Sequence, residues 1–369
     1  MVAGGISQFL DICPSPGCLA VQYDRKGNVV RKWPLKSSAL LDAKSVVEGK
    51  FSYGGNDPTK NISVVGLQMF KNGDLLVSLA LRNSFPYGWG LARIDSEGNV
   101  VWRKRDFYHH WAKLTVNGDI YSPFYEIRDD HQYQGVPKEI QLDLICPKPD
   151  KQFADFVHVL GHDGRIKKRI DLVRLVANNK RYNSLLARSR DSCDPLHLNF
   201  VDVASPEEAA ETDWLETGDM LLSFKAISAV MVISADGQLI KRAFSGSFAV
   251  QHSAQFVENG KILLFDNMGA SESSLSSRLI QIDLKDGSEK VLYSRQNPAE
   301  YSINAGNISL SADGKRALLS YTRTGHAIEL ELTTGKRIST YDHAHPIPAT
   351  KNKKQIFYLF GAWFVKNDR

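Results

Sequence analysis

A repeated sequence motif occurs along almost the whole chain and restricts the folds that the chain can adopt. Each copy is an apolar segment, a turn with glycine and a second segment ending in aromatic or basic residues; the six turn glycines are Gly27, Gly98, Gly164, Gly237, Gly287 and Gly335. A second motif alternates with the first. It is an Asn/Asp/Gly turn followed by an apolar run, as in FKNGDLLVSL (70–79) and VENGKILLF (257–265). Short apolar segments joined by such turns indicate β-hairpins.

Pairs of these motifs recur about every 40–70 residues, which is typical of the four-stranded sheets, or blades, of a β-propeller. Five blades are expected in residues 62–105, 110–172, 197–244, 252–294 and 304–343. Two half-repeats remain, residues 19–33 at one end and 355–365 at the other. We therefore predict an all-β fold, a six-bladed β-propeller closed by pairing of the N- and C-terminal strands, which removes exposed sheet edges. A pair of β-sandwiches, the competing all-β fold, would not explain the complementary half-repeats.

The chain of 369 residues is expected to form this propeller as a single domain, with residues 1–18 as an N-terminal extension. Three polar stretches interrupt the repeats, at 125–156, 178–195 and 204–217. Loops of this length are usually functional lids or rims. Within the third stretch, ASPEEAAE (204–211) predicts one short helix.

The charge and hydropathy patterns exclude several kinds of partner. The net charge of +5 is spread along the sequence, and no Arg/Lys stripe with interleaved aromatic residues predicts nucleic-acid binding. No apolar run approaches the roughly 18 residues of a membrane span. The first residues lack the pattern of a signal peptide, so we expect a targeting segment to be absent from this chain.

The four cysteines leave two interpretations open. Cys13 and Cys18 flank a short loop, CPSPGC, that could close as a disulfide in an oxidising compartment. The alternative is two unrelated reduced thiols. No second close pair of Cys or His completes a zinc site.

Histidines occupy one phase of the repeat in three of the predicted blades. His110 and His252 each stand eight residues before a turn glycine, and His197 opens the blade between theirs. Residues just before the innermost strands of a propeller gather at one mouth of its channel, so we expect these imidazoles to converge there. His109, Asn199, Lys225 and Asn267 add polar groups at the same mouth. Three imidazoles could bind a metal, but no carboxylate or cysteine recurs at this phase, so no metal is expected.

Five segments together resemble the bacterial arylsulfotransferases: DPLHLNFVDV, GDMLLSFKAISAVMVIS, QHSAQFVENGKILLFDN, SSRLIQID and AGNISLSADGK. These PAPS-independent enzymes are built on a six-bladed propeller. The resemblance extends from about Val100 to the last blade, and the ordered set of HH, HLN and QHSAQF is specific. It implies transfer of a sulfuryl group from an aryl sulfate donor to a phenolic acceptor through a sulfated histidine. It also implies no cofactor, consistent with the missing GxxxxGK[ST] phosphate loop, and a periplasmic or otherwise exported protein.

Matching the motifs assigns roles to individual residues. His252 is similar to the family's nucleophile, and His197 and His110 to the partners that handle charge and protons. Lys225 stands where the family usually has arginine, so the positive charge is kept but the planar fork that grips two sulfate oxygens is lost. The expected substrate-binding residues are Asn199, His109 and Asn267.

Two other functions share these residues. A hydrolase of the same ester would use water in place of the phenol. A non-catalytic propeller that binds a ligand or protein would be favoured if the three histidines lay far apart.

Overall fold

The computed structural model describes residues 2–4, 12–13, 17–36, 40, 62–81, 88–128, 152–189, 193–269, 276–342, 344–346, 354–356, 359 and 361–364. They fall into two compact units. The first comprises Met1–Ala112, Ser274–Ser276 and Arg295–Arg369, and the second comprises Lys113–Ser273 and Ser277–Ser294.

The described part of the first unit contains three four-stranded sheets, whose hydrogen-bonded order follows the chain in two of them. One consists of β4 (Ile62–Met69), β5 (Leu75–Leu81), β6 (Gly88–Ile94) and β7 (Val100–Lys104). Another consists of β20 (Asn307–Leu310), β21 (Arg316–Tyr321), β22 (His326–Glu331) and β23 (Arg337–Asp342). The third joins the two ends of the chain, in the order β26 (Ala362–Trp363), β1 (Val2–Gly4), β2 (Cys18–Tyr23) and β3 (Val29–Pro34). A separate pair is formed by β24 (Ala344–Pro346) and β25 (Lys354–Ile356).

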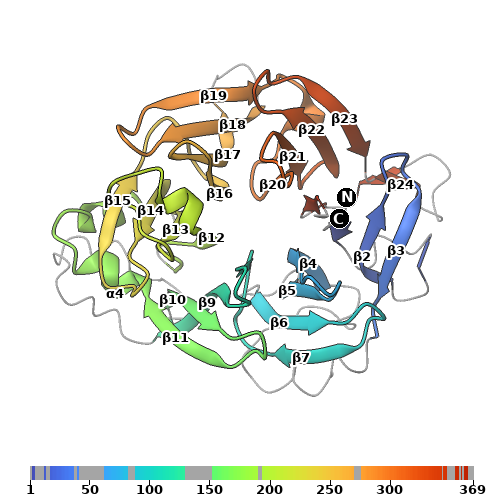
Figure 1. The fold of residues 1–369 in the computed structure, drawn as a ribbon, viewed down its shortest axis with the longest axis horizontal. Coiled ribbons are helices and arrows are strands. Elements are labelled where there is room, and N and C mark those ends of the chain that lie inside the picture. The colour runs from blue at the N-terminus through green and yellow to red at the C-terminus, as the bar shows by residue number, and fades with distance from the viewer. Residues whose placement is uncertain are drawn as a thin grey trace. The chain divides into compact units, whose positions relative to one another are not determined.

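The described part of the second unit contains three further four-stranded sheets in chain order, and Figure 1 labels their strands except β8. The first has β8 (Lys113–Leu114), β9 (Ile120–Arg128), β10 (Gln152–Leu160) and β11 (Ile166–Asp171). The second has β12 (Leu198–Val203), β13 (Met220–Phe224), β14 (Ala229–Ile233) and β15 (Ile240–Phe244). The third has β16 (His252–Val257), β17 (Lys261–Gly269), β18 (Ser276–Asp283) and β19 (Glu289–Ser294). Helices are short: α4 (Leu172–Ala177), η3 (Asn183–Arg188), α5 (Pro206–Ala209) and, in the first unit, η4 (Pro298–Glu300).

Burial falls from the first strands of a sheet to its last. Every residue of β12, β13 and β14 is buried, whereas four of the five residues of β15 are half-buried. The apolar runs MLLSF and AVMVI therefore pack on both faces, and each fully buried Leu, Val, Ile or Met contributes about 1.5–3 kcal/mol. In the second unit this core joins two sheets, because Leu221 and Val230 share a cluster with Ile262 and Ile280.

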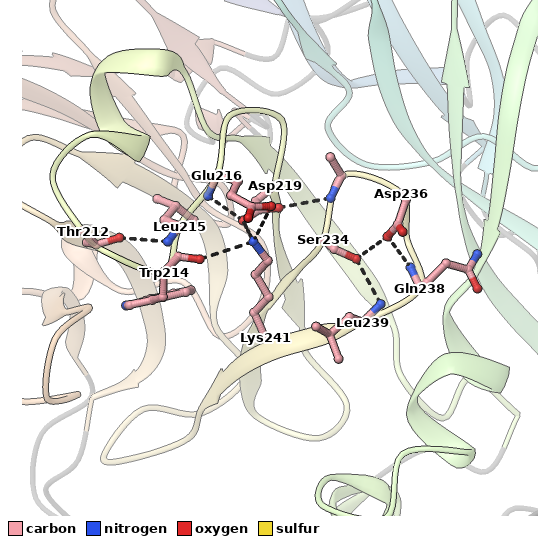
Figure 2. A network of polar contacts seen from close by, with 11 residues as sticks. Thr212, Trp214, Leu215, Glu216, Asp219, Ser234, Asp236, Gln238, Leu239 and Lys241 are labelled. Atoms are coloured by element: carbon pink, nitrogen blue, oxygen red, sulfur yellow. Dashed lines mark hydrogen bonds and ion pairs between the residues drawn. The ribbon is translucent and has the colours of Figure 1, made fainter.

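The acidic stretch at 204–217 is fixed onto β15 by a buried carboxylate (Figure 2). Asp219 accepts hydrogen bonds from the backbone N–H of Glu216 at 2.8 Å and of Ala235 at 3.1 Å, and its Oδ2 lies 2.7 Å from Lys241 Nζ. Removing one partner of such a buried pair typically costs about 3–5 kcal/mol. The predicted short helix is present as α5, with a capping box formed by Ser205 and Glu208.

The all-β propeller class is confirmed, and the five predicted repeats correspond to the sheets β4–β7, β8–β11, β12–β15, β16–β19 and β20–β23. The six turn glycines all have positive φ, from 67° to 84°. The blade count of six, the closure into a ring and the single domain stay predictions.

Three details of the sequence interpretation were wrong. Residues 1–18 are not only an extension, because β1 lies between β26 and β2. Among the described residues of 355–365, Ala362 and Trp363 alone join that sheet. Lys354–Ile356 instead pairs with β24. The interruption at 125–156 is shorter than expected, since residues 125–128 belong to β9 and residues 152–156 to its partner β10. The residues between them, 129–151, lie outside the described residues. Within the described residues, no helix is long and apolar enough to cross a membrane.

Candidate functional site

His252 begins β16 at a break in the regular backbone. Val250 and Ser253, on either side of it, have positive φ values of 57° and 55°. The pairing with β17 shifts register between His252 and Gln255. Bulges of this kind redirect side chains next to active sites, and strained non-glycine residues gather there. The irregular backbone therefore sets the direction of the His252 imidazole.

The hydrogen bonds of His252 define which ring nitrogen carries the proton. Nδ1 lies 2.7 Å from Asn267 Oδ1 and 2.9 Å from the carbonyl oxygen of Val250. Both partners are acceptors, so Nδ1–H donates and the lone pair is on Nε2. Burial lowers the pKa of His252 from 6.5 to about 3, with the positive charge of Lys225 as the next cause. The imidazole is therefore neutral at neutral pH.

Lys225 and His197 are joined through the backbone of one hairpin. Lys225 N–H donates to the carbonyl oxygen of His197 at 3.1 Å, directly after β13 ends. Lys225 is half-buried, and His197 has a φ of 52°. The charges of Lys225 and His197 both lower the pKa of His252, so both side chains interact electrostatically with its ring. The second unit thus brings together three of the predicted site residues.

Asn199 and Asn267 are both buried and hold the His252 segment in place. Asn199 Nδ2 donates to the carbonyl oxygen of Gln251 at 2.7 Å. Gln251 Nε2 in turn donates to the carbonyl oxygens of Phe224 at 3.0 Å and Ala229 at 2.9 Å. These contacts fix the backbone before His252, while Asn267 fixes its ring. Substrate binding by Asn199 and Asn267 stays a prediction.

His109 and His110 lie in the first unit, just before β8, and their Nδ1 atoms are 2.7 Å apart. His109 is buried, and His110 has a φ of 49°. The backbone of His110 packs against Gly66, where a larger residue would not fit, because a Cβ at Gly66 would lie 2.5 Å from the His110 carbonyl oxygen. The strand-start position shared with His197 and His252 is present, and convergence of all three histidines stays a prediction.

Sequence reasoning missed an acidic group behind His197. Asp194 Oδ2 lies 2.5 Å from His197 Nδ1 and accepts the hydroxyl of Tyr125 at 2.9 Å. Asp155 Oδ1 accepts the backbone N–H of Leu198 at 3.1 Å. Burial, followed by the Asp194 carboxylate, raises the pKa of Asp155 well above its usual value. The DPLH sequence held the signal for Asp194, since it places a carboxylate three residues before the histidine.

The cysteine prediction is resolved in favour of the bonded form. Cys13 and Cys18 form a disulfide beside β2. Cys193 is disulfide-bonded as well, which the sequence analysis did not anticipate. Among the residues that the structure describes, no three His, Cys, Asp or Glu side chains form a group that could hold a metal ion.

Comparisons with solved structures return matches of low sequence identity. A protein of unknown function from Bacteroides caccae is 11% identical, with 92% of each chain covered and a TM-score of 0.49. Virginiamycin B lyase from Staphylococcus aureus is 9% identical, with 77% of this chain and 70% of that chain covered and a TM-score of 0.42. The Cps50 (Swd1) β-propeller domain of Myceliophteria thermophila is 11% identical, with coverage of 88% and 80% and a TM-score of 0.46. No curated protein matches the chain.

The family comparison agrees with the motifs. Residues 163–351, about half of the chain, match the arylsulfotransferase (ASST) family. The matched region includes His197, Lys225, His252 and Asn267. It also includes the carboxylate of Asp194 that holds His197. The chain therefore belongs to the arylsulfotransferase family.

Proposed function

We propose that the protein moves a sulfuryl group from an aryl sulfate ester to a phenolic acceptor through a sulfated His252, without PAPS. Family membership supports sulfotransferase activity in general. The observation that carries the finer proposal is the state of His252: a neutral ring with Nδ1–H held by two oxygen acceptors. Its Nε2 is thereby prepared as a nucleophile, which splits one difficult transfer into two easier steps.

In the first step, His252 Nε2 attacks the ester sulfur, an N–S bond forms and the S–O bond to the phenol breaks. The ring gains positive charge as it gives up its lone pair, and the oxygens of Asn267 and Val250 stabilise that charge at Nδ1–H. Lys225, whose charge already acts on His252, stabilises the negative sulfuryl oxygens in this proposal. The leaving phenolate takes a proton from His197.

In the second step, an acceptor phenol returns its proton to His197 as its oxygen attacks the sulfur. The N–S bond breaks, a new aryl sulfate leaves and His252 is neutral again. Each such proton transfer typically contributes about 10²–10⁴-fold. His110 completes the site in this proposal by stabilising charge on the group in transfer, and His109 contributes to substrate binding.

The architecture of this proposal is a single domain in which the six four-stranded sheets close as six blades, with β1–β26 pairing as the closure. We also propose a periplasmic or otherwise exported location. Its support is the bonded state of Cys13, Cys18 and Cys193, since disulfides persist in oxidising compartments.

The test is incubation with a chromogenic aryl sulfate, with and without a phenol. We expect phenol release that depends on the acceptor, ping-pong kinetics and, with donor alone, a sulfate on the peptide that contains His252. His252→Ala should abolish transfer. Equal release without acceptor would instead identify a hydrolase, and no release with any aryl sulfate would favour a non-catalytic propeller. Full turnover in the alanine variant, or sulfate on another residue, would contradict the mechanism.

A further inference from the structure

A buried pair of carboxyl groups lies behind His197 in the second unit. Asp155 is fully buried and Asp194 is 2% exposed. Tyr125, which is 1% exposed, contacts Asp194 through its hydroxyl. Buried acids are costly unless they are paired and hydrogen-bonded, so a cluster of this kind needs a reason.

The cluster draws on two sheets. Tyr125 of β9 and Asp155 of β10 are direct partners across the strand pair. Asp194 lies in the segment that leads into β12, the first strand of the next sheet. Tyr125, Asp155 and Asp194 therefore all lie near the start of β12. His197 is the residue just before that strand.

The two acids hold different parts of His197. Asp194 Oδ2 accepts the ring Nδ1–H at 2.5 Å, and the Tyr125 hydroxyl donates to the same oxygen at 2.9 Å. Asp155 accepts the backbone N–H groups of His197 and Leu198. This matters because His197 has a φ of 52°, a conformation that non-glycine residues adopt at a cost and that neighbours must maintain.

Only one of the two acids can be ionised at low cost, because like charges in a buried site oppose each other. Asp155 is the one that keeps its proton, since burial and the Asp194 carboxylate both raise its pKa. Its Oδ2 is buried, and no hydrogen-bond donor among the described residues reaches it. An ionised oxygen buried without a donor is costly, which agrees with the raised pKa of Asp155.

We propose that Asp194 is a positioning residue for His197 and that protonated Asp155 is its companion, which leaves a single negative charge behind the ring. This inference rests on the proposed function, in which His197 exchanges a proton with the phenolic oxygen. With Nδ1–H held by Asp194, the exchange takes place at Nε2. The proton leaves Nε2 for the departing phenolate, which makes the ring neutral, and it returns from the acceptor phenol. The Asp194 charge stabilises the imidazolium that is present before the first step and forms again in the second.

Asp194→Asn tests the carboxylate. The amide keeps the shape but removes the charge and can favour the wrong tautomer, so we expect transfer to fall by about 10²–10⁴-fold. The loss should be largest for donors whose phenols have a high pKa and small for nitrophenyl sulfates, whose phenolates leave without a proton. A merely structural role would not depend on the leaving phenol. Asp236→Asn is the matched control, since Asp236 is exposed in the turn after β14.

Asp155→Asn and Asp155→Leu test the companion. An asparagine can still accept the Leu198 N–H through its oxygen and donate an N–H in place of the acid O–H. We expect it to retain most of the wild-type rate, whereas leucine, which can do neither, should lose activity together with stability. If asparagine proved as damaging as leucine, Asp155 would have to act as an ionised group and this half of the proposal would be overturned.

A measurement without substrate separates this inference from the proposed function. In protein labelled with ¹⁵N-histidine, His197 Nδ1–H should give a low-field proton signal that is lost in Asp194→Asn and kept in Asp155→Asn. Absence of that signal in the wild type overturns the positioning role, even if the variants fail to fold. A wild type that shows the signal but transfers no sulfate would overturn the proposed function alone. A wild type that is active, and whose Asp194→Asn variant keeps the full rate with slow donors, would overturn this inference alone.

Discussion

Acidification should destabilise the protein through His252 in particular. Its pKa falls from 6.5 to about 3 on folding, because of burial first and the Lys225 charge second. Below pH 6.5 the unfolded chain binds a proton at this histidine that the folded protein does not bind. The stabilisation from the neutral ring is therefore complete above pH 6.5 and is lost as the pH falls from 6.5 toward 3.

The size of the effect follows from the two pKa values. At pH 5 the unfolded histidine is almost fully protonated and the folded one is still neutral, which changes the unfolding equilibrium by about 30-fold. That factor corresponds to about 2 kcal/mol, since one pKa unit is about 1.36 kcal/mol. For a protein of ordinary stability, about 5–15 kcal/mol, this is a measurable fraction.

Urea unfolding with disulfides intact, at pH 7 and pH 5, measures the effect in the wild type and in His252→Gln. Glutamine does not titrate, so the wild type should lose about 2 kcal/mol more than the variant between the two pH values. Other ionisable groups are common to both proteins and cancel in the comparison. His162→Gln, which removes an exposed histidine, controls for the loss of one imidazole. Equal pH dependence in wild type and His252→Gln would refute the reasoning.

Three further predictions concern the site and the N-terminal disulfide. Lys225→Ala should lower transfer by about 10²–10³-fold, as loss of a preorganised charge does, and Lys225→Arg should keep most activity in the same kinetic assay. Asn267→Asp should raise the pKa of His252, because a carboxylate favours the imidazolium; the acid limb of the single-turnover pH–rate profile should then move toward neutral pH. Replacing both Cys13 and Cys18 by alanine should lower the free energy of unfolding by about 2 kcal/mol, measured by urea titration, because the closed loop is short.

The repeats were readable from sequence because their signals are local. A turn glycine with positive φ and flanking segments of period two fix each hairpin within about 20 residues. The repeat at 252–294, for example, coincides with β16–β19, which runs from His252 to Ser294. In these segments the local preferences of the sequence agree with the folded structure, so tertiary contacts did not change the predicted strands.

The closing sheet was predicted only in outline, because its end strands are too short to carry a pattern. β1 has three residues and β26 has two. Their pairing, Val2 with Trp363 and Ala3 with Ala362, joins opposite ends of the chain. Neither propensity nor periodicity encodes such a contact.

The site was predicted unevenly for a similar reason. The phase of the repeat located His252, and the family resemblance pointed to Lys225; in the structure the Lys225 charge lowers the pKa of His252. Asp155 was hidden in an apolar strand, FADFVHVL, where a single acid gives no sign of its partner. The role of Asp155 depends on Asp194, which lies in the segment before β12. Folding alone brings these two residues together.

The two imidazoles of the second unit have opposite electrostatic surroundings, and this difference suits the two roles proposed for them. Burial first and the Lys225 charge second lower the pKa of His252 and keep its ring neutral. The oxygens of Asn267 and Val250 accept Nδ1–H, which leaves the lone pair on Nε2. His197 instead donates its Nδ1–H to the carboxylate of Asp194. Lys225 therefore has two effects on the reaction. It can attract the sulfate ester, and it holds the nucleophile unprotonated, so its removal should weaken donor binding and also bring protonation of His252 closer to neutral pH.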